Sequence, residues 1–99
     1  KAMGKINANG SSNKAPYNAT VTRLSTGRYQ VNLSPAMPDA NYIIQLTVRD
    51  SAGAGNDDYD ISYSNQTVSG FIVEIGDNDN GASNRISRDF EFMFTVLNY

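Results

Sequence analysis

Hydrophobic and polar residues alternate in short runs along most of the chain, and the clearest alternation lies near its end. From Phe90 to Val96, apolar side chains occupy every second position, and Glu91, Met93 and Thr95 stand between them. A period of two places one set of side chains on each face of a β-strand. This strand is therefore expected to bury its phenylalanine face.

Similar runs predict strands around residues 3–6, 20–22, 28–33, 42–49, 58–63 and 71–75. The apolar residues that alternate with other positions in these runs are Tyr29, Val31, Leu33, Tyr42, Ile44, Leu46, Val48, Tyr59, Ile61, Tyr63, Phe71, Val73 and Ile75. Turn-forming residues separate the runs, with longer loops at 51–57 and 76–84. No stretch of ten or more residues carries apolar side chains at helical spacing. The chain is therefore predicted to be an all-β, antiparallel β-sandwich of about six or seven strands.

The length of 99 residues fits a single domain, residues 1–99. Because the chain starts at Lys1 without an initiator methionine, it is expected to be a piece of a longer protein. It carries no apolar stretch of the kind that forms a signal peptide or a membrane span, so no membrane insertion is expected.

Charge and residue types narrow the chemistry. The formal net charge is −2, and the eight basic residues are scattered singly, so nucleic acid is not an expected partner. The chain contains neither cysteine nor histidine, which excludes the usual nucleophile–base pairs. A hydrolase with paired carboxylates stays open in principle, but acids in loops rich in Gly and Asn are typical of soluble turns. We predict no enzymatic activity and no cofactor.

The acidic run that begins at Asp77 is similar to the start of a calcium-binding loop. The template needs an oxygen ligand at its fifth position and glycine at its sixth, whereas Gly81 stands fifth here. A turn with an Asn-Gly corner explains the run more simply. No metal site is predicted.

Two loops carry the residue types that bind sugars. Carboxylates, amides and guanidinium groups hydrogen-bond to hydroxyl groups, and an aromatic ring stacks on the apolar face of a sugar. The predicted ligand-binding residues are Asn56, Asp57, Asp58, Tyr59, Asp77, Asn78, Asp79, Asn80, Asn84 and Arg85. The alternative is that Tyr59 and Tyr63 face the core and that the acids only keep the loops soluble.

The last strand is also apolar on its second face, where a solvated sheet is normally polar. Met93, Leu97 and Tyr99 occupy that face. They are the predicted oligomer interface.

One stretch of the chain resembles a known family. It reads Gly27-Arg28-Tyr29-Gln30-Val31-Asn32-Leu33 and then Ala36-Met37-Pro38-Asp39-Ala40-Asn41-Tyr42. It is similar to the Gly-x-Tyr-x-Val-x-Phe and Ala-Met-Pro-x-Ala-x-Tyr segments near the C-terminus of phage tail fibres and related prophage tail proteins. Tyr17-Asn18-Ala19, Val21-Thr22-Arg23 and Met3-Gly4-Lys5-Ile6-Asn7 resemble the segments that precede them. Met3 replaces the usual tryptophan and Leu33 the usual phenylalanine, and the two polar loops match no family pattern.

This resemblance implies the C-terminal tip domain of a fibre, located on the virion and exposed to the extracellular medium. It implies a homotrimer that binds a receptor on the host surface, a polysaccharide or an outer-membrane component. Two alternatives remain: a structural cap of the fibre without a ligand, and a carbohydrate-binding module of a secreted protein. The second is disfavoured because such modules commonly use tryptophan, which the chain lacks.

Overall fold

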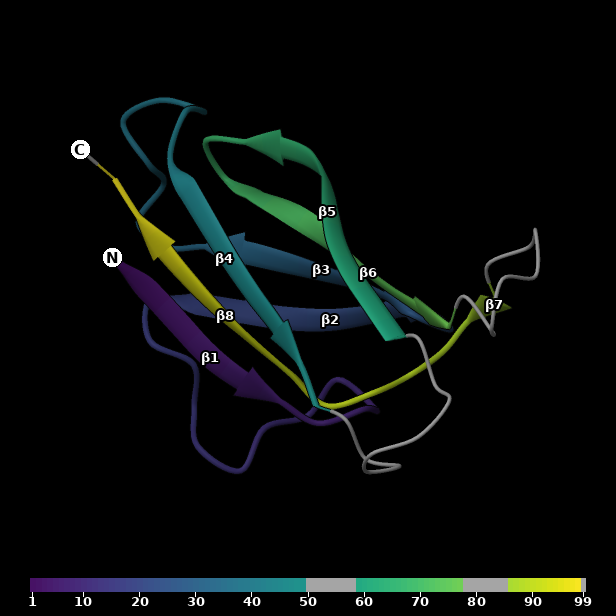
Figure 1. Cartoon of the computed structure of the whole chain (residues 1–99). Coiled ribbons are helices and arrows are strands. Elements are labelled where there is room, and N and C mark those ends of the chain that lie inside the picture. Colours follow the sequence, from purple (N-terminus) through teal and green to yellow (C-terminus); the bar gives the residue numbers. More distant parts are fainter. Residues whose placement is uncertain (50–58, 78–85, 99) are drawn as a thin grey trace.

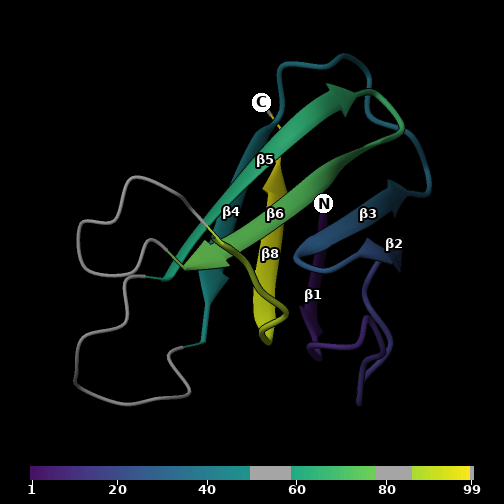
Figure 2. The same cartoon turned by 90° about the vertical axis from the view of Figure 1, so that its right-hand side faces the viewer.

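The computed structural model describes residues 1–49, 59–77 and 86–98, which form two antiparallel β-sheets (Figures 1 and 2). The strands are β1 (Ala2–Ile6), β2 (Ala19–Ser25), β3 (Arg28–Leu33), β4 (Ile43–Val48), β5 (Tyr59–Thr67), β6 (Gly70–Asp77), β7 (Ile86–Ser87) and β8 (Phe92–Leu97). One sheet has three strands in the order β1-β8-β4. The other has five, in the order β2-β3-β6-β5, with β7 added to β6.

The predicted all-β class and the two antiparallel sheets are confirmed. The described residues contain no helix, and so none that could cross a membrane. They contain eight strands rather than six or seven, because the two-residue β7 pairs with the end of β6. Gly76 and Asp77 belong to β6 and not to the loop expected from residue 76, and β5 continues four residues beyond Tyr63.

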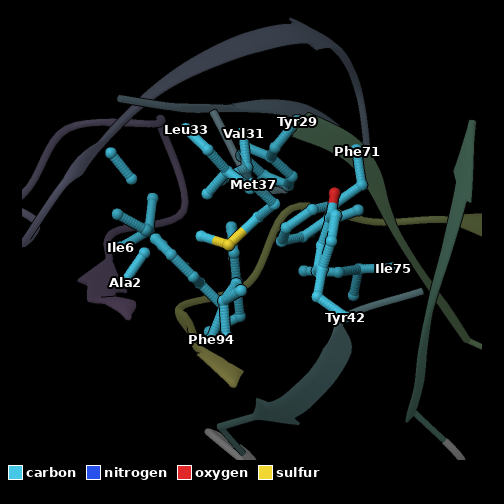
Figure 3. Packing of buried hydrophobic residues seen from close by; sticks show 14 residues of the cluster. Ala2, Ile6, Tyr29, Val31, Leu33, Met37, Tyr42, Phe71, Ile75 and Phe94 are labelled. Carbon is cyan, nitrogen blue, oxygen red and sulfur yellow. The ribbon is translucent and has the colours of Figure 1, made fainter. Parts of the chain in front are cut away.

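The core lies between the two sheets, where the alternating apolar residues of β3, β6 and β8 meet (Figure 3). The ring of Tyr29 lies 4.9 Å from that of Phe92, centroid to centroid, and Phe71 meets Phe94 edge-on at 6.2 Å. The Met37 side chain reaches in from the connection between β3 and β4. Tilted and edge-on ring pairs are the favoured arrangements of buried aromatic side chains.

The alternation puts Tyr63 on the core side of its strand, but the residue is not buried. It stands opposite Val73, which is fully buried, yet its own side chain is 50% exposed. The reason is the unequal width of the sheets: β5 is an edge strand, and the facing sheet ends at β4. For the same reason the inner face of β4 is only half-buried.

Met37 and Tyr42 hold the β3–β4 connection in place. The Met37 amide donates to the Val68 carbonyl at 2.8 Å, and the buried Tyr42 hydroxyl donates to the Thr67 carbonyl at 2.6 Å. Gly70 starts β6 with φ of 154°, and a Cβ there would overlap the Val31 carbonyl oxygen. These contacts join the connection to the β5–β6 turn.

Candidate functional site

The two predicted binding loops leave the fold from neighbouring strands. Tyr59 pairs with Asp77 between β5 and β6, and Asp77 pairs in turn with Ile86 of β7. The start of β5, the end of β6 and the start of β7 therefore stand in one row, on the opposite side of the molecule from the two termini (Figure 1). The sequence alone did not show that these positions are adjacent.

Of the ten predicted ligand-binding residues, the structure describes Tyr59 and Asp77. The others lie outside the described residues: Asn56, Asp57, Asp58, Asn78, Asp79, Asn80, Asn84 and Arg85. Tyr59 is half-buried, and its ring packs on Phe90 with 4.1 Å between the centroids. One face of the Tyr59 ring is thus engaged within the fold. Within the described part of the chain, no group of three or more acidic side chains comes close enough together to hold a metal ion.

A network around Asp89 anchors the chain just after β7. One carboxylate oxygen accepts hydrogen bonds from Arg23 Nε at 3.0 Å and Nη2 at 2.8 Å. The other accepts from the Gly27 amide at 2.8 Å and lies 2.9 Å from the Tyr29 hydroxyl. That hydroxyl also lies 2.6 Å from the Ala8 carbonyl oxygen, so its single proton serves two acceptors. The network ties the segment between β7 and β8 to the β2–β3 hairpin.

The same contacts set the protonation of the network. Burial alone would raise the pKa of Asp89, but the hydrogen bonds from Arg23, Gly27 and Tyr29 outweigh it and hold the pKa below its ordinary value of 3.8. Burial, followed by the hydrogen bond to Asp89, raises the pKa of Tyr29 well above 10.0. At neutral pH, Asp89 is therefore a carboxylate and Tyr29 a neutral hydroxyl, which is the pairing that the hydrogen bonds require.

The outer face of the three-stranded sheet, which is turned away from the core, carries exposed apolar side chains. Met93 and Leu97 are 43% and 42% exposed, as their alternation predicted, whereas Tyr99 lies outside the described residues. Met93 and Leu97 have different neighbours in the sheet. Leu97 stands opposite Ile43, which is equally exposed. Met93 stands between Lys5 and Thr47. The face therefore has two apolar areas.

Met93 belongs to a groove that was not predicted from the residue pattern. The segment between β1 and β2 returns beside β1 and leaves an open cavity of about 620 Å³ between itself and the outer face. We call it the Tyr17 groove, and its main lining residues are Met3, Lys5, Lys14, Pro16, Tyr17 and Met93. In the sequence, Tyr17 follows a proline and lies in a stretch without alternation. These two features were the only indication that its ring lies outside a strand. It is the most exposed of the large hydrophobic side chains described, at 60%.

Comparisons with models of protein families, with curated proteins and with solved structures found no match to this chain. What the chain does is therefore inferred from its residues and their geometry.

Proposed function

We propose that this chain is the tip domain of a phage tail fibre, which assembles as a homotrimer and binds a polysaccharide receptor on the host surface. The observation that carries the proposal is the difference between the two ends of the molecule. Both termini lie at one end, where Ala2 pairs with Val96, and the strand ends that bear the two polar loops lie at the other (Figure 1). Such a domain attaches to a stem at one end and presents binding groups at the other.

The resemblance to tail fibres supports the proposal through the fold. Tyr29, Val31 and Leu33 are buried in β3. Met37 and Tyr42 are buried as well, and both hydrogen-bond to the β5–β6 turn. The residues that carry the resemblance thus determine the framework. The choice of receptor belongs to other residues, because a shared framework does not specify what is bound.

The contact between subunits is proposed to lie at the Ile43–Leu97 end of the outer face. Two adjacent aliphatic side chains on neighbouring strands, each more than 40% exposed, form an apolar area that a second copy of the chain would cover. Ile43 begins β4 and Leu97 ends β8, and these strand ends lie at the end of the molecule that holds both termini (Figure 1). Packing there joins the copies where a shared stem would enter, and it leaves the start of β5 and the end of β6 away from the contact.

Sedimentation equilibrium of the purified domain tests the assembly. We expect a trimer at tens of micromolar and a monomer for Leu97→Asp, because a carboxylate at the contact would have to be buried without a partner. Leu24→Asp is the matched control: Leu24 is similarly exposed, at 49%, but lies on β2 of the five-stranded sheet. A monomeric wild-type domain would contradict the proposal.

Receptor binding is tested on an array of bacterial surface polysaccharides. We expect the trimer to bind a subset of them, with several weak sites acting together. A trimer that binds none of the polysaccharides would favour the alternative of a structural cap. A monomer that binds would favour the carbohydrate-binding module.

A further inference from the structure

The Tyr17 groove has the size and the rigidity of a binding site. Its volume of about 620 Å³ lies within the range of about 300–1,000 Å³ that is usual for pockets that hold small ligands. Two backbone hydrogen bonds fix its outer wall: the Met3 amide donates to the Tyr17 carbonyl at 3.1 Å, and the Tyr17 amide donates to the Met3 carbonyl at 2.8 Å. The wall is therefore in place before a ligand arrives.

Gly4 allows that wall to lie close to the sheet. A Cβ at this position would stand 3.1 Å from the Cβ of Pro16 and 2.7 Å from the ring of Phe94. Asn7 ties down the preceding turn, since its side-chain amide donates to Ser11 and to Asn13, each at 3.1 Å. The groove is thus a built feature of the β1–β2 connection.

The floor and one side of the groove are apolar. The side chains of Met3 and Met93 project from the outer face of adjacent strands, and Ala15 and Pro16 also line the groove. The Tyr17 ring stands at the edge of the groove and is 60% exposed. An exposed aromatic ring beside flexible thioethers suits a ligand that has one flat apolar face.

The charges of the groove are of one sign. Lys5 and Lys14 line it, and none of the described lining residues is acidic, although the chain as a whole carries a net charge of −2. Lys5 is 67% exposed and lies 3.7 Å from Glu91, a distance typical of a weak surface ion pair. Lys14 forms no ion pair with a described residue. A ligand with a negative charge therefore complements this groove.

From these observations we infer that the Tyr17 groove binds an acidic sugar residue, such as the uronate of a surface polysaccharide. The apolar face of the sugar ring stacks on Tyr17 and the methionines. Its carboxylate meets the ammonium groups of Lys14 and Lys5, and the hydroxyl groups of Tyr17 and Thr95 are available to the sugar hydroxyls. This inference rests on the proposed function, because it names the class of polysaccharide, and it adds a recognition site on the outer face of the three-stranded sheet.

The groove and the proposed subunit contact occupy different parts of one face. Met93 and Leu97 are four residues apart on β8, which corresponds to about 13 Å along a strand. Met93 lies beside Lys5 of β1, whereas Leu97 lies beside Ile43 of β4. Each copy in a trimer would thus keep its groove open.

Titration of the 15N-labelled domain with oligosaccharides from a glucuronate-containing polysaccharide tests the inference by NMR. The matched ligand is the same preparation after carboxyl reduction, which turns each uronate into a neutral hexose. We expect shifts at the amides of Lys5, Ala15, Tyr17 and Met93, and at least tenfold weaker binding of the reduced ligand. Tyr17→Ala and Lys14→Glu should each weaken binding about tenfold, and Tyr17→Phe by no more than about threefold.

Tyr63→Ala is the matched control, since Tyr63 is 50% exposed but lies on β5 of the other sheet. Three outcomes would overturn the inference. The first is that the amide shifts are confined to residues 59–77 and 86–98 and do not include Met93. The others are that the reduced ligand binds as tightly as the acidic one, and that neither ligand binds. If a second copy of the chain fills the groove instead, Tyr17→Ala will dissociate the oligomer in the centrifuge and no amide will respond to sugar. A monomer that binds the glucuronate ligand in the groove would contradict only the trimer.

Discussion

Replacing Asp89 with asparagine is expected to lower the free energy of unfolding at neutral pH by about 2 kcal/mol. The carboxylate accepts hydrogen bonds from Arg23 on one oxygen and from the Gly27 amide on the other, at 2.8–3.0 Å. Asparagine has one oxygen and one NH2 group, so in either orientation a donor will face a donor. Bonds to a charged group contribute about 1.5–3 kcal/mol, and partial exposure of the Asp89 side chain, at 27%, argues for the lower half of that range.

The effect should depend on pH in a defined direction. The pKa of Asp89 is lower in the folded protein than its ordinary value of 3.8. A carboxyl of this kind contributes stability above its unfolded pKa and loses that contribution as the pH falls through its folded pKa. The difference between the wild type and Asp89→Asn should therefore be constant between about pH 5 and pH 8 and should shrink below about pH 4.

Urea unfolding followed by circular dichroism at pH 7 and at pH 3 measures the free energies of unfolding. Thermal unfolding at pH 7 should show a drop in Tm of about 10 °C. Glu91→Gln is the matched control, because the ion pairs of the Glu91 carboxylate with described residues are longer, at 3.6 and 3.7 Å. Its cost should stay below about 1 kcal/mol. An Asp89→Asn variant as stable as the wild type, or a deficit of the same size at pH 7 and pH 3, would refute the role given to this network.

Two further substitutions test the β3–β4 connection, both by thermal unfolding. Gly70→Ala should destabilise the fold by about 3 kcal/mol or more, because a Cβ would overlap the Val31 carbonyl oxygen and the backbone has φ of 154°. Gly10→Ala is the control for this substitution. The φ angle of Gly10 is also positive, at 90°, but Gly10 is less buried than Gly70. The atom nearest to a Cβ added there would be the side-chain Cβ of Arg23, at 3.0 Å. Tyr42→Phe should cost about 1 kcal/mol, because the Thr67 carbonyl loses its donor; an unchanged Tm would contradict this.

The alternation of residues predicted the sheets well because most strands have one buried and one open face. Tyr29, Val31 and Leu33 were placed correctly on that basis alone. The pattern failed where burial depends on the partner sheet. Tyr63 lies at one of the alternate positions of its strand that face the core, but nothing in its own segment indicates that the opposite sheet is two strands narrower. The two-residue β7 is too short to show a period at all.

The candidate sites were harder to predict because each is assembled from distant segments. The Tyr17 groove combines residues 3–5, 14–17 and 93–95, which meet only after β1 has paired with β8. The Asp89 network joins positions 60 or more residues apart. The apolar second face of the last strand did give a correct signal: Met93 and Leu97 are exposed. The sequence could not show that they belong to two different areas.

That division explains how one short strand can serve three purposes. In β8, Phe92, Phe94 and Val96 fill the core, and the alternate positions are free to face outward. In the proposed assembly, Leu97 contacts a neighbouring copy at the end near the termini, and Met93 forms part of the floor of the groove at the other end. Because both depend on one strand, subunit packing in that assembly would fix the spacing of the three grooves relative to one another. Weak binding of single sugar residues at fixed spacing becomes strong binding to a repeating polysaccharide only when its repeat matches that spacing. The receptor would then be recognised by its repeat as well as by its charge, and this requires no match to a family pattern in the polar loops.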